Sequence, residues 1–187
     1  KTKTVIISAT SWDAEKTLIY GFNHQEFKKK IKIISYGSCT VNAFIPLGSF
    51  MENNYGIIDA DVNVVHNIQE YRLKDNITLN RKFCTLEKSG PQLLKSINKK
   101  NFKVNYTVVP YTGVSMIDFR FRLKKCPSIN KLINTLEKET KDGDLKGLYN
   151  IHETDRGPKV HNCTPFSSVF IRENFKIIKD QVYISGY

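Results

Sequence analysis

Residues 31–42 read IKIISYGSCTVN, an apolar run that stops at a glycine and is soon followed by a cysteine. The run 31–35 predicts a strand, and the spacing of apolar residues over 40–53 predicts a helix, which Pro46 should kink. Cys39 would then lie at the first turn of that helix. Because a helix N-terminus carries partial positive charge, we expect the pKa of this thiol to be lowered and its nucleophilic thiolate favoured.

His66 is the second residue of interest. The segment 57–71 alternates apolar and polar side chains with a period of two, which predicts a strand, and His66 has the parity of the apolar face that includes Ile58 and Val64. A lone histidine in such a place is most often a packed core residue. Its pairing with Cys39 favours a second interpretation, in which the imidazole is the general base for the thiol.

Length and composition bound the class of protein. A chain of 187 residues suits one domain, or one domain and part of another, and both ends lie in strand-like segments, which suggests a fragment of a longer protein. No apolar run could span a membrane and no secretory signal pattern is present, so no membrane partner is expected. The net charge of +11 would suit nucleic acid. Lysine far outnumbers arginine, however, and no aromatic platform interrupts the basic run 28–30, so nucleic acid is not favoured as a partner.

The cysteines and histidines predict no metal site. No two of the four cysteines form a CxxC pair, and no histidines have zinc spacing, so we expect reduced thiols and a cytoplasmic location. Cysteines 84, 126 and 163 have no base partner in the sequence pattern, and histidines 24, 152 and 161 are interpreted as surface or structural residues.

The pattern of elements predicts an α+β fold. Strands are expected over 4–8, 31–35, 57–71, 102–109, 114–123, 147–151, 166–172 and 174–185, and helices over 40–53, 92–97 and 128–140, with a helix or turn over 12–22. Long antiparallel-type strands mixed with helices indicate a sheet with one face covered. The first 38 residues differ, and they look like the end of an α/β domain.

The motifs around the cysteine resemble the glyceraldehyde-3-phosphate dehydrogenase family. That family has a strand ending in Ile-Ser-Ala, an Asn-His pair, Lys-Ile-Ile-Ser and then Ser-Cys-Thr-x-Asn. The matching residues here are Ile7-Ser8-Ala9, Asn23-His24, Lys32-Ile33-Ile34-Ser35 and Ser38-Cys39-Thr40-Val41-Asn42. Further matches are Val65-His66, Val109-Pro110, Val114-Ser115 with Asp118, and Asp144-Leu145-Lys146-Gly147. The resemblance covers nearly the whole chain and is weakest between 70 and 100.

The resemblance implies a fold and two domains. Residues 1–38 would be the C-terminal remnant of an NAD(P)-binding Rossmann domain. Residues 39–187 would be a catalytic domain, truncated at its C-terminus, with a mostly antiparallel mixed sheet covered by helices like the family's C-terminal domain. NAD or NADP would then be bound mostly by the missing part of the Rossmann domain, because this chain has no Gly-rich phosphate turn.

The resemblance also implies an activity, the NAD(P)-dependent oxidation of an aldehyde through a cysteine thiohemiacetal and thioester. Cys39 would be the nucleophile and His66 the base, and the Cys39 N–H with His66 would hold the oxyanion. The implied substrate or phosphate ligands are Ser38, Thr40, Ser89 and Gly90, with Arg81 as a substitute ligand. The implied cofactor contacts are Ala9, Thr10 and Asn42, and no metal is implied. The protein would act on a small aldehyde as a homo-oligomer.

Three departures from the family pattern bear on the substrate. Val108 stands where the family has an arginine that grips a phosphate, Gln69 stands where it has a threonine, and the loop 71–88 is shorter. Two alternatives therefore remain open. One is a thiol-based acyl-transfer or hydrolytic enzyme without redox work. The other is a non-catalytic relative that acts as a binding or assembly protein through a basic surface.

Overall fold

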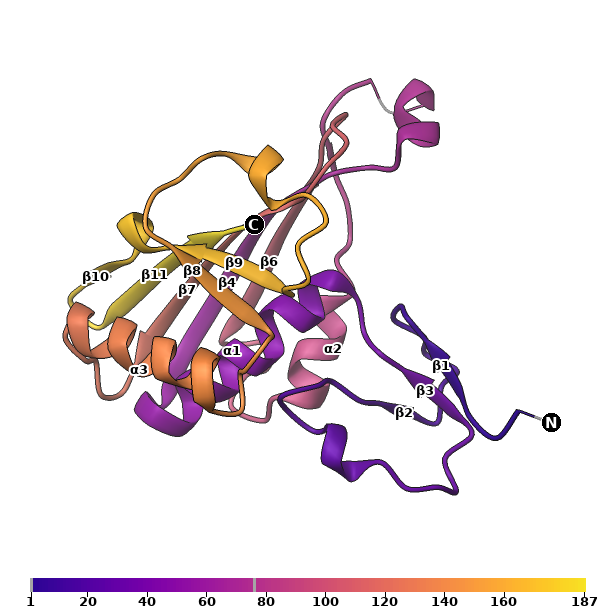
Figure 1. The fold of residues 1–187 in the computed structure, drawn as a ribbon, viewed down its shortest axis with the longest axis horizontal. Helices are drawn as coiled ribbons and strands as arrows, with labels where there is room; N and C mark the ends of the chain where they lie inside the picture. The colour runs from indigo at the N-terminus through magenta and orange to yellow at the C-terminus, as the bar shows by residue number, and fades with distance from the viewer. Residues whose placement is uncertain (1, 76) are drawn as a thin grey trace.

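The computed structural model describes residues 2–75 and 77–187, which form a small N-terminal sheet and a larger sheet with helices (Figure 1). The small sheet is parallel, has the order β1-β3-β2, and consists of β1 Val5–Ile7, β2 Lys16–Thr17 and β3 Ile33–Ser35. Of the predicted helix or turn over 12–22, the helix is wrong: β2 lies there, with a turn over 20–22 before the 3₁₀ turn η1, His24–Glu26. Residue 1 of the predicted domain 1–38 lies outside the described part, and the domain division stays a prediction.

The larger sheet is mixed, and most neighbouring strands are antiparallel. Its order is β5-β6-β4-β7-β11-β9-β8, with β10 also paired to β11; β4–β6 and β8–β9 are the parallel pairs among these. The strands are β4 Ile57–His66, β5 Asn80–Arg81, β6 Phe102–Val108, β7 Met116–Leu123, β8 Tyr149–His152, β9 Ser168–Ile171, β10 Lys176–Ile178 and β11 Gln181–Gly186. The predicted mixed, mostly antiparallel sheet is therefore confirmed.

Three α-helices pack on the apolar side of this sheet (Figure 1). They are α1 Cys39–Tyr55, α2 Leu86–Leu93 and α3 Ile129–Asp142, with the 3₁₀ turns η2 Glu70–Asp75, η3 Pro158–His161 and η4 Arg172–Asn174 between strands. The predicted helix over 92–97 is displaced, because α2 begins at Leu86 and includes Pro91 near its end. No helix in 2–75 or 77–187 has both the length and the apolar character needed to cross a bilayer.

The core lies between α1 and strands β4, β6 and β7. The Phe44 ring of α1 packs against the rings of Phe102 and Phe121, with centroids 5.0 and 5.7 Å away. A register shift between Ile57 and Asp59 makes a bulge in β4, so Ile57 is buried and Ile58 is 39% exposed. The predicted placement of Ile58 on the apolar face is thus wrong. The predicted placement of Ala60, Val62 and Val64 on that face is confirmed, because all three are buried.

Tyr149 of β8 satisfies the backbone of α1 around Pro46. Proline has no N–H, so the carbonyl of Asn42 loses its helical partner. The buried Tyr149 hydroxyl lies within donating distance of the carbonyl oxygens of Asn42 (3.2 Å) and Ala43 (2.9 Å), and it accepts from the Leu47 N–H at 3.1 Å. Burial raises the pKa of Tyr149, so the hydroxyl keeps the proton that this bonding needs. The helix that carries Cys39 is therefore fixed to the far edge of the sheet.

Candidate active site

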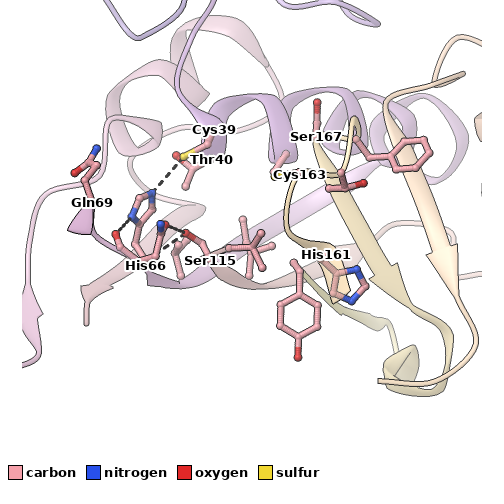
Figure 2. Close-up of a pocket in the computed structure, with 16 residues that line it drawn as sticks. Cys39, Thr40, His66, Gln69, Ser115, His161, Cys163 and Ser167 are labelled. Atoms are coloured by element: carbon pink, nitrogen blue, oxygen red, sulfur yellow. Dashed lines mark hydrogen bonds between the residues drawn. The ribbon is translucent and has the colours of Figure 1, made fainter. Parts of the chain in front are cut away.

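A pocket of about 370 Å³ lies at the N-terminal end of α1, between this helix, β4 and β7 (Figure 2). Small-molecule sites commonly have volumes of roughly 300–1,000 Å³, so this pocket is at the small end of the range. Cys39 and His66 line one end of it, and His161 and Cys163 line the other (Figure 2). Tyr187, also a lining residue, stacks on His161.

Cys39 and His66 form a hydrogen-bonded pair across the pocket wall. The sulfur of Cys39 lies 3.3 Å from Nε2 of His66, and Nδ1 of His66 lies 2.6 Å from the carbonyl oxygen of Asn67 (Figure 2). A carbonyl oxygen can only accept, so Nδ1 carries the proton and Nε2 presents its lone pair to the thiol. This tautomer allows His66 to take a proton from Cys39.

Ser115 of the turn before β7 holds the loop that orients the imidazole. Its hydroxyl donates to the side-chain oxygen of Asn67 at 2.9 Å and accepts from the Asn67 N–H at 3.4 Å. The Asn67 carbonyl is thereby placed against Nδ1 of His66. The Tyr106 ring packs on the imidazole, with centroids 5.2 Å apart. The base thus has a fixed orientation before any substrate binds.

Ser38 caps α1 and connects it to neighbouring segments. Its Oγ accepts from the Val41 N–H at 3.4 Å. The Thr85 hydroxyl donates to Ser38 Oγ at 2.8 Å, and the Thr10 hydroxyl reaches Thr85 Oγ1 at 3.4 Å. These hydroxyls join the segment after β1, the start of α2 and the N-terminus of α1, so the position of Cys39 depends on all three.

The predicted lowering of the Cys39 pKa is wrong in direction. Desolvation by the surrounding protein raises the pKa of this thiol, and the backbone N–H groups of Thr40 and Cys39 oppose the rise without cancelling it. Helix-end charge therefore does not by itself favour the thiolate here, and Nε2 of His66 is the neighbouring group positioned to accept the thiol proton.

The predicted phosphate ligands do not gather in the pocket. Thr40 lines it, but its hydroxyl lies 3.0 Å from Ser38 Oγ and 3.4 Å from the sulfur of Cys84. Ser89 and Gly90 are buried inside α2, outside the pocket lining. Arg81 is exposed at the end of the short strand β5 and does not line the pocket either. Their phosphate role stays a prediction.

The predicted cofactor contacts lie beside the small parallel sheet. The Ala9 carbonyl accepts from the Ser35 hydroxyl at 2.9 Å, and Thr10 is bonded to the start of α2. Asn42, in the first turn of α1, donates through its amide nitrogen to the carbonyl oxygens of Tyr36 (2.9 Å) and Ser38 (3.0 Å). The structure therefore brings these residues near the entry of α1, where their cofactor role stays a prediction.

Sequence reasoning missed five residues of the pocket. Asn67 and Ser115 support the base, whereas His161, Cys163 and Tyr187 form the opposite end. Ser115 belongs to a quoted motif and could have been assigned from it. Asn67 directly follows His66 but carries no motif signal, whereas His161, Cys163 and Tyr187 come from distant segments that only the tertiary fold brings to Cys39. All four cysteines are free, as predicted from their spacing, and the described residues hold no group of three or more acidic, His or Cys ligands suited to a metal.

Comparison with known proteins gives one consistent result. No family model matches the chain. The muscle glyceraldehyde-3-phosphate dehydrogenase of Jaculus orientalis is 30% identical over 181 residues, which cover 90% of this chain and 49% of the relative. The cytosolic glyceraldehyde-3-phosphate dehydrogenase of Dianthus caryophyllus is 29% identical over 167 residues, which cover 82% of this chain and 48% of the relative. A cytosolic enzyme of the same name from Pisum sativum is 30% identical over a similar span.

The chain spans about half the length of these curated relatives. Their identity is low, but the matches cover most of this chain and all carry one family name. The quoted motifs around Cys39 and His66 point to the same family. The chain is a divergent member of the glyceraldehyde-3-phosphate dehydrogenase family.

Proposed function

We propose that this protein oxidises an aldehyde with NAD or NADP as hydride acceptor, through a covalent adduct on Cys39. The observation that carries the proposal is the 3.3 Å contact between the Cys39 sulfur and Nε2 of His66, with Nδ1 held on a backbone carbonyl. A thiol and an oriented base in one pocket form the arrangement needed for nucleophilic attack on a carbonyl carbon.

The first step forms a carbon–sulfur bond. His66 takes the Cys39 proton, the sulfur attacks the aldehyde carbon, and the carbonyl electron pair moves onto oxygen. That oxygen would lie near the Cys39 N–H at the helix start and near the protonated His66, which returns the proton to give a neutral thiohemiacetal. Oxidation leaves a thioester on Cys39, with His66 accepting the hydroxyl proton as the hydride leaves the carbon.

A nicotinamide cofactor would supply the hydride acceptor for this oxidation. The described residues fit one part of such a site. Ala9 and Thr10 follow the carboxyl end of the parallel strand β1, where ligands of open α/β sheets bind, and Asn42 lies at the entry of α1. These residues would hold the nicotinamide end. The described residues have no Gly-rich turn for the pyrophosphate.

The fate of the thioester belongs to the same proposal. Phosphate or water would attack the thioester carbon and release the Cys39 thiolate. Ser38 and Thr40 flank Cys39 in the chain, and of the predicted phosphate ligands Thr40 alone lines the pocket. The relatives named cytosolic favour a cytoplasmic location, and the family resemblance favours a homo-oligomer.

One observation favours a second candidate, a non-catalytic binding or assembly protein with a basic surface. Burial raises the pKa of Cys39, which reduces the thiolate fraction at neutral pH. The net charge of +11 would serve such a role. It predicts a protein whose thiol does not react with aldehydes and whose nucleic-acid binding weakens with salt.

The test is reduced-cofactor formation by the full-length protein with a panel of phosphorylated and uncharged aldehydes, with NAD and with NADP. Cys39→Ser should abolish turnover, and His66→Asn should lower it by about 10²–10⁴-fold, the usual contribution of a general base. Cys126→Ser is the matched control, because Cys126 lies outside the pocket, and it should retain activity. Folded protein without turnover on any aldehyde would refute the proposal.

A further inference from the structure

We propose that the Cys39 pocket selects short, uncharged hydroxyaldehydes and discriminates against phosphorylated ones. The proposal rests on the proposed aldehyde oxidation, and it names the substrate class of that site. Its basis is the chemistry of the pocket wall in the described residues, together with the charge state of the histidine at the far end.

The first observation is the lack of fixed positive charge in the pocket wall. No lysine or arginine of the described chain lines the pocket, although 29 of the 187 residues are Lys or Arg. The polar side chains in the wall are mostly uncharged hydroxyls and amides, namely Thr40, Asn67, Gln69, Ser115, Thr164 and Ser167. Val64, Val114, Ile117 and Phe166 supply the apolar part. The wall thus offers hydrogen bonds without a counter-charge.

The second observation concerns His161, the titratable group that could bring positive charge to the far end. It is only 2% exposed, its Nε2 has no hydrogen-bond partner, and its ring stacks on Tyr187 with centroids 4.7 Å apart. Burial and the neighbouring His152 lower the pKa of His161, and Asp155 only partly offsets this. His161 is therefore neutral at neutral pH and offers no charge to an anion.

The third observation is the position beside His66 on the neighbouring strand. Val108 pairs with His66 in the β4–β6 register, and its side chain is 6% exposed. Its apolar side chain cannot replace the missing cation. Arg81 pairs with Thr107 on the adjacent strand, but it is exposed and lies outside the pocket lining. The strands next to the base therefore bring no guanidinium into the pocket.

These observations favour uncharged over phosphorylated aldehydes, because the two classes differ in the free energy needed to remove them from water. A phosphate carries close to two negative charges at neutral pH, and moving it from water into a wall without a cation is strongly unfavourable. A substrate hydroxyl exchanges bonds to water for bonds to the Ser, Thr, Asn and Gln side chains, which is close to neutral or favourable. The small pocket volume also restricts the chain length of the aldehyde.

The first experiment measures the charge preference of the pocket without requiring turnover. The 187-residue chain is alkylated with neutral iodoacetamide and with anionic iodoacetate, and labelling of Cys39 is followed by peptide mass spectrometry. The ratio of the two rates is divided by the same ratio for N-acetylcysteine. We expect a normalised ratio above one in favour of iodoacetamide. A ratio of one, or any preference for iodoacetate, would overturn the proposal.

A charge-insertion pair shows whether the measurement reports the pocket. Ser167→Lys places a cation in the lining, whereas Thr135→Lys adds the same charge at a half-buried position of α3 outside the lining. Ser167→Lys should shift the ratio toward iodoacetate by about threefold or more, and Thr135→Lys should leave it unchanged. If the two variants give the same ratio as each other and as the unmodified chain, the pocket wall does not control charge selection and the proposal is wrong.

The second experiment uses aldehydes themselves. Glyceraldehyde and glyceraldehyde 3-phosphate are compared as protectants of Cys39 against iodoacetamide, since a reversible thiohemiacetal blocks alkylation. The uncharged aldehyde should protect at a lower concentration, and protection by the phosphorylated one alone would overturn the inference. Cofactor reduction with phosphorylated aldehydes only would refute the inference and keep the proposed function. Protection by the uncharged aldehyde, without cofactor reduction by any aldehyde, would support the inference about the pocket and refute the proposed function.

Discussion

Cys39 shows how far a single residue's chemistry depends on its surroundings. The sequence places it at a helix start, where the backbone charge favours the thiolate. In the folded chain, desolvation outweighs that effect and raises the pKa of the thiol. In the proposed mechanism Cys39 acts as the nucleophile because Nε2 of His66, 3.3 Å away, is positioned to accept its proton. The proposed reactivity therefore belongs to the pair.

The raised pKa predicts the pH profile of Cys39 alkylation. The iodoacetamide rate should increase with pH and reach half its maximum above about 8.5, the usual value of a free thiol, because the thiolate is disfavoured in the pocket. The prediction is checked by quenching the alkylation reaction at timed intervals over a series of pH values and measuring the labelling of Cys39 by mass spectrometry. A plateau that begins below neutral pH would instead indicate a thiolate–imidazolium pair, and it would contradict the prediction.

Gly37 is needed at the turn that directs the chain into α1. It has φ +76, and a Cβ there would lie 2.8 Å from Ile19 Cδ1 and 3.0 Å from Val41 Cγ1. Gly37→Ala should therefore lower the free energy of unfolding by more than the roughly 1–2 kcal/mol that left-handed backbone alone costs. Gly147→Ala is the control, since Gly147 lies in a turn with φ +74 and has nothing within 4 Å of the added atom. Urea denaturation of both variants checks the difference, and equal losses would contradict it.

At the scale of elements, α1 keeps its helix through Pro46 because another element supplies the missing bonds. The hydroxyl of Tyr149 accepts from the Leu47 N–H and serves the carbonyls of Asn42 and Ala43. The helix that presents Cys39 therefore depends on β8, which is more than a hundred residues away in the chain, with sequence separations of 102 to 107. A local pattern cannot predict this contact.

Tyr149→Phe tests that dependence. The change leaves a buried N–H and two carbonyls without the hydroxyl, so it should lower the free energy of unfolding by about 1–3 kcal/mol. Tyr183→Phe is the control, because the Tyr183 hydroxyl donates to the part-buried side chain of Gln181. Its removal should change the free energy of unfolding by no more than about 0.5 kcal/mol. Equal denaturation midpoints for the two variants would show that Pro46 is accommodated in another way.

Periodicity predicted the long elements correctly and failed where a local irregularity or a distant contact decides. The apolar face of α3 is a strong pattern and that helix is confirmed. The strand predicted over 57–71 is confirmed as far as His66, whereas its last residues are wrong because η2 begins at Glu70. The bulge between Ile57 and Asp59 turns Ile58 away from the buried face of the sheet. The strand β2 has two residues, which is too short for an alternating pattern to be recognised. Within the site, the motif located Cys39 and His66, whereas His161 is brought to them only by the fold.

At the scale of the whole molecule, the pocket joins segments from the first helix to the last strand. Cys39 comes from α1 and His66 from β4, whereas His161 is the last residue of η3 and stacks on Tyr187. The hydroxyl of Tyr187 donates to Asp155 at 2.9 Å, which fixes the loop to the end of β11. Folding of this loop and burial of His161 are thus one event, and proton binding at His161 should report on global stability.

The lowered pKa of His161 predicts a loss of stability in mild acid. Burial and His152 lower its pKa below the value of about 6.5 in the unfolded chain, while Asp155 opposes the shift, so the unfolded state binds the proton more readily. The contribution of His161 is present above about pH 6.5 and is lost as the pH falls toward its folded pKa. The slope from one such group is at most about 1.4 kcal/mol per pH unit.

Urea denaturation between about pH 5 and pH 7, a range in which histidines titrate, checks this. Asp180, whose pKa Arg122 lowers, loses its contribution only below about pH 4, so it does not affect this window. His161→Phe retains an aromatic ring against Tyr187 and removes the titration, so its free energy of unfolding should vary less with pH than that of the unmodified chain. The two curves should lie closest at pH 7 if ring packing is preserved, because His161 is neutral there. Parallel curves across the window would show that folding does not lower the pKa of His161, and would contradict the prediction.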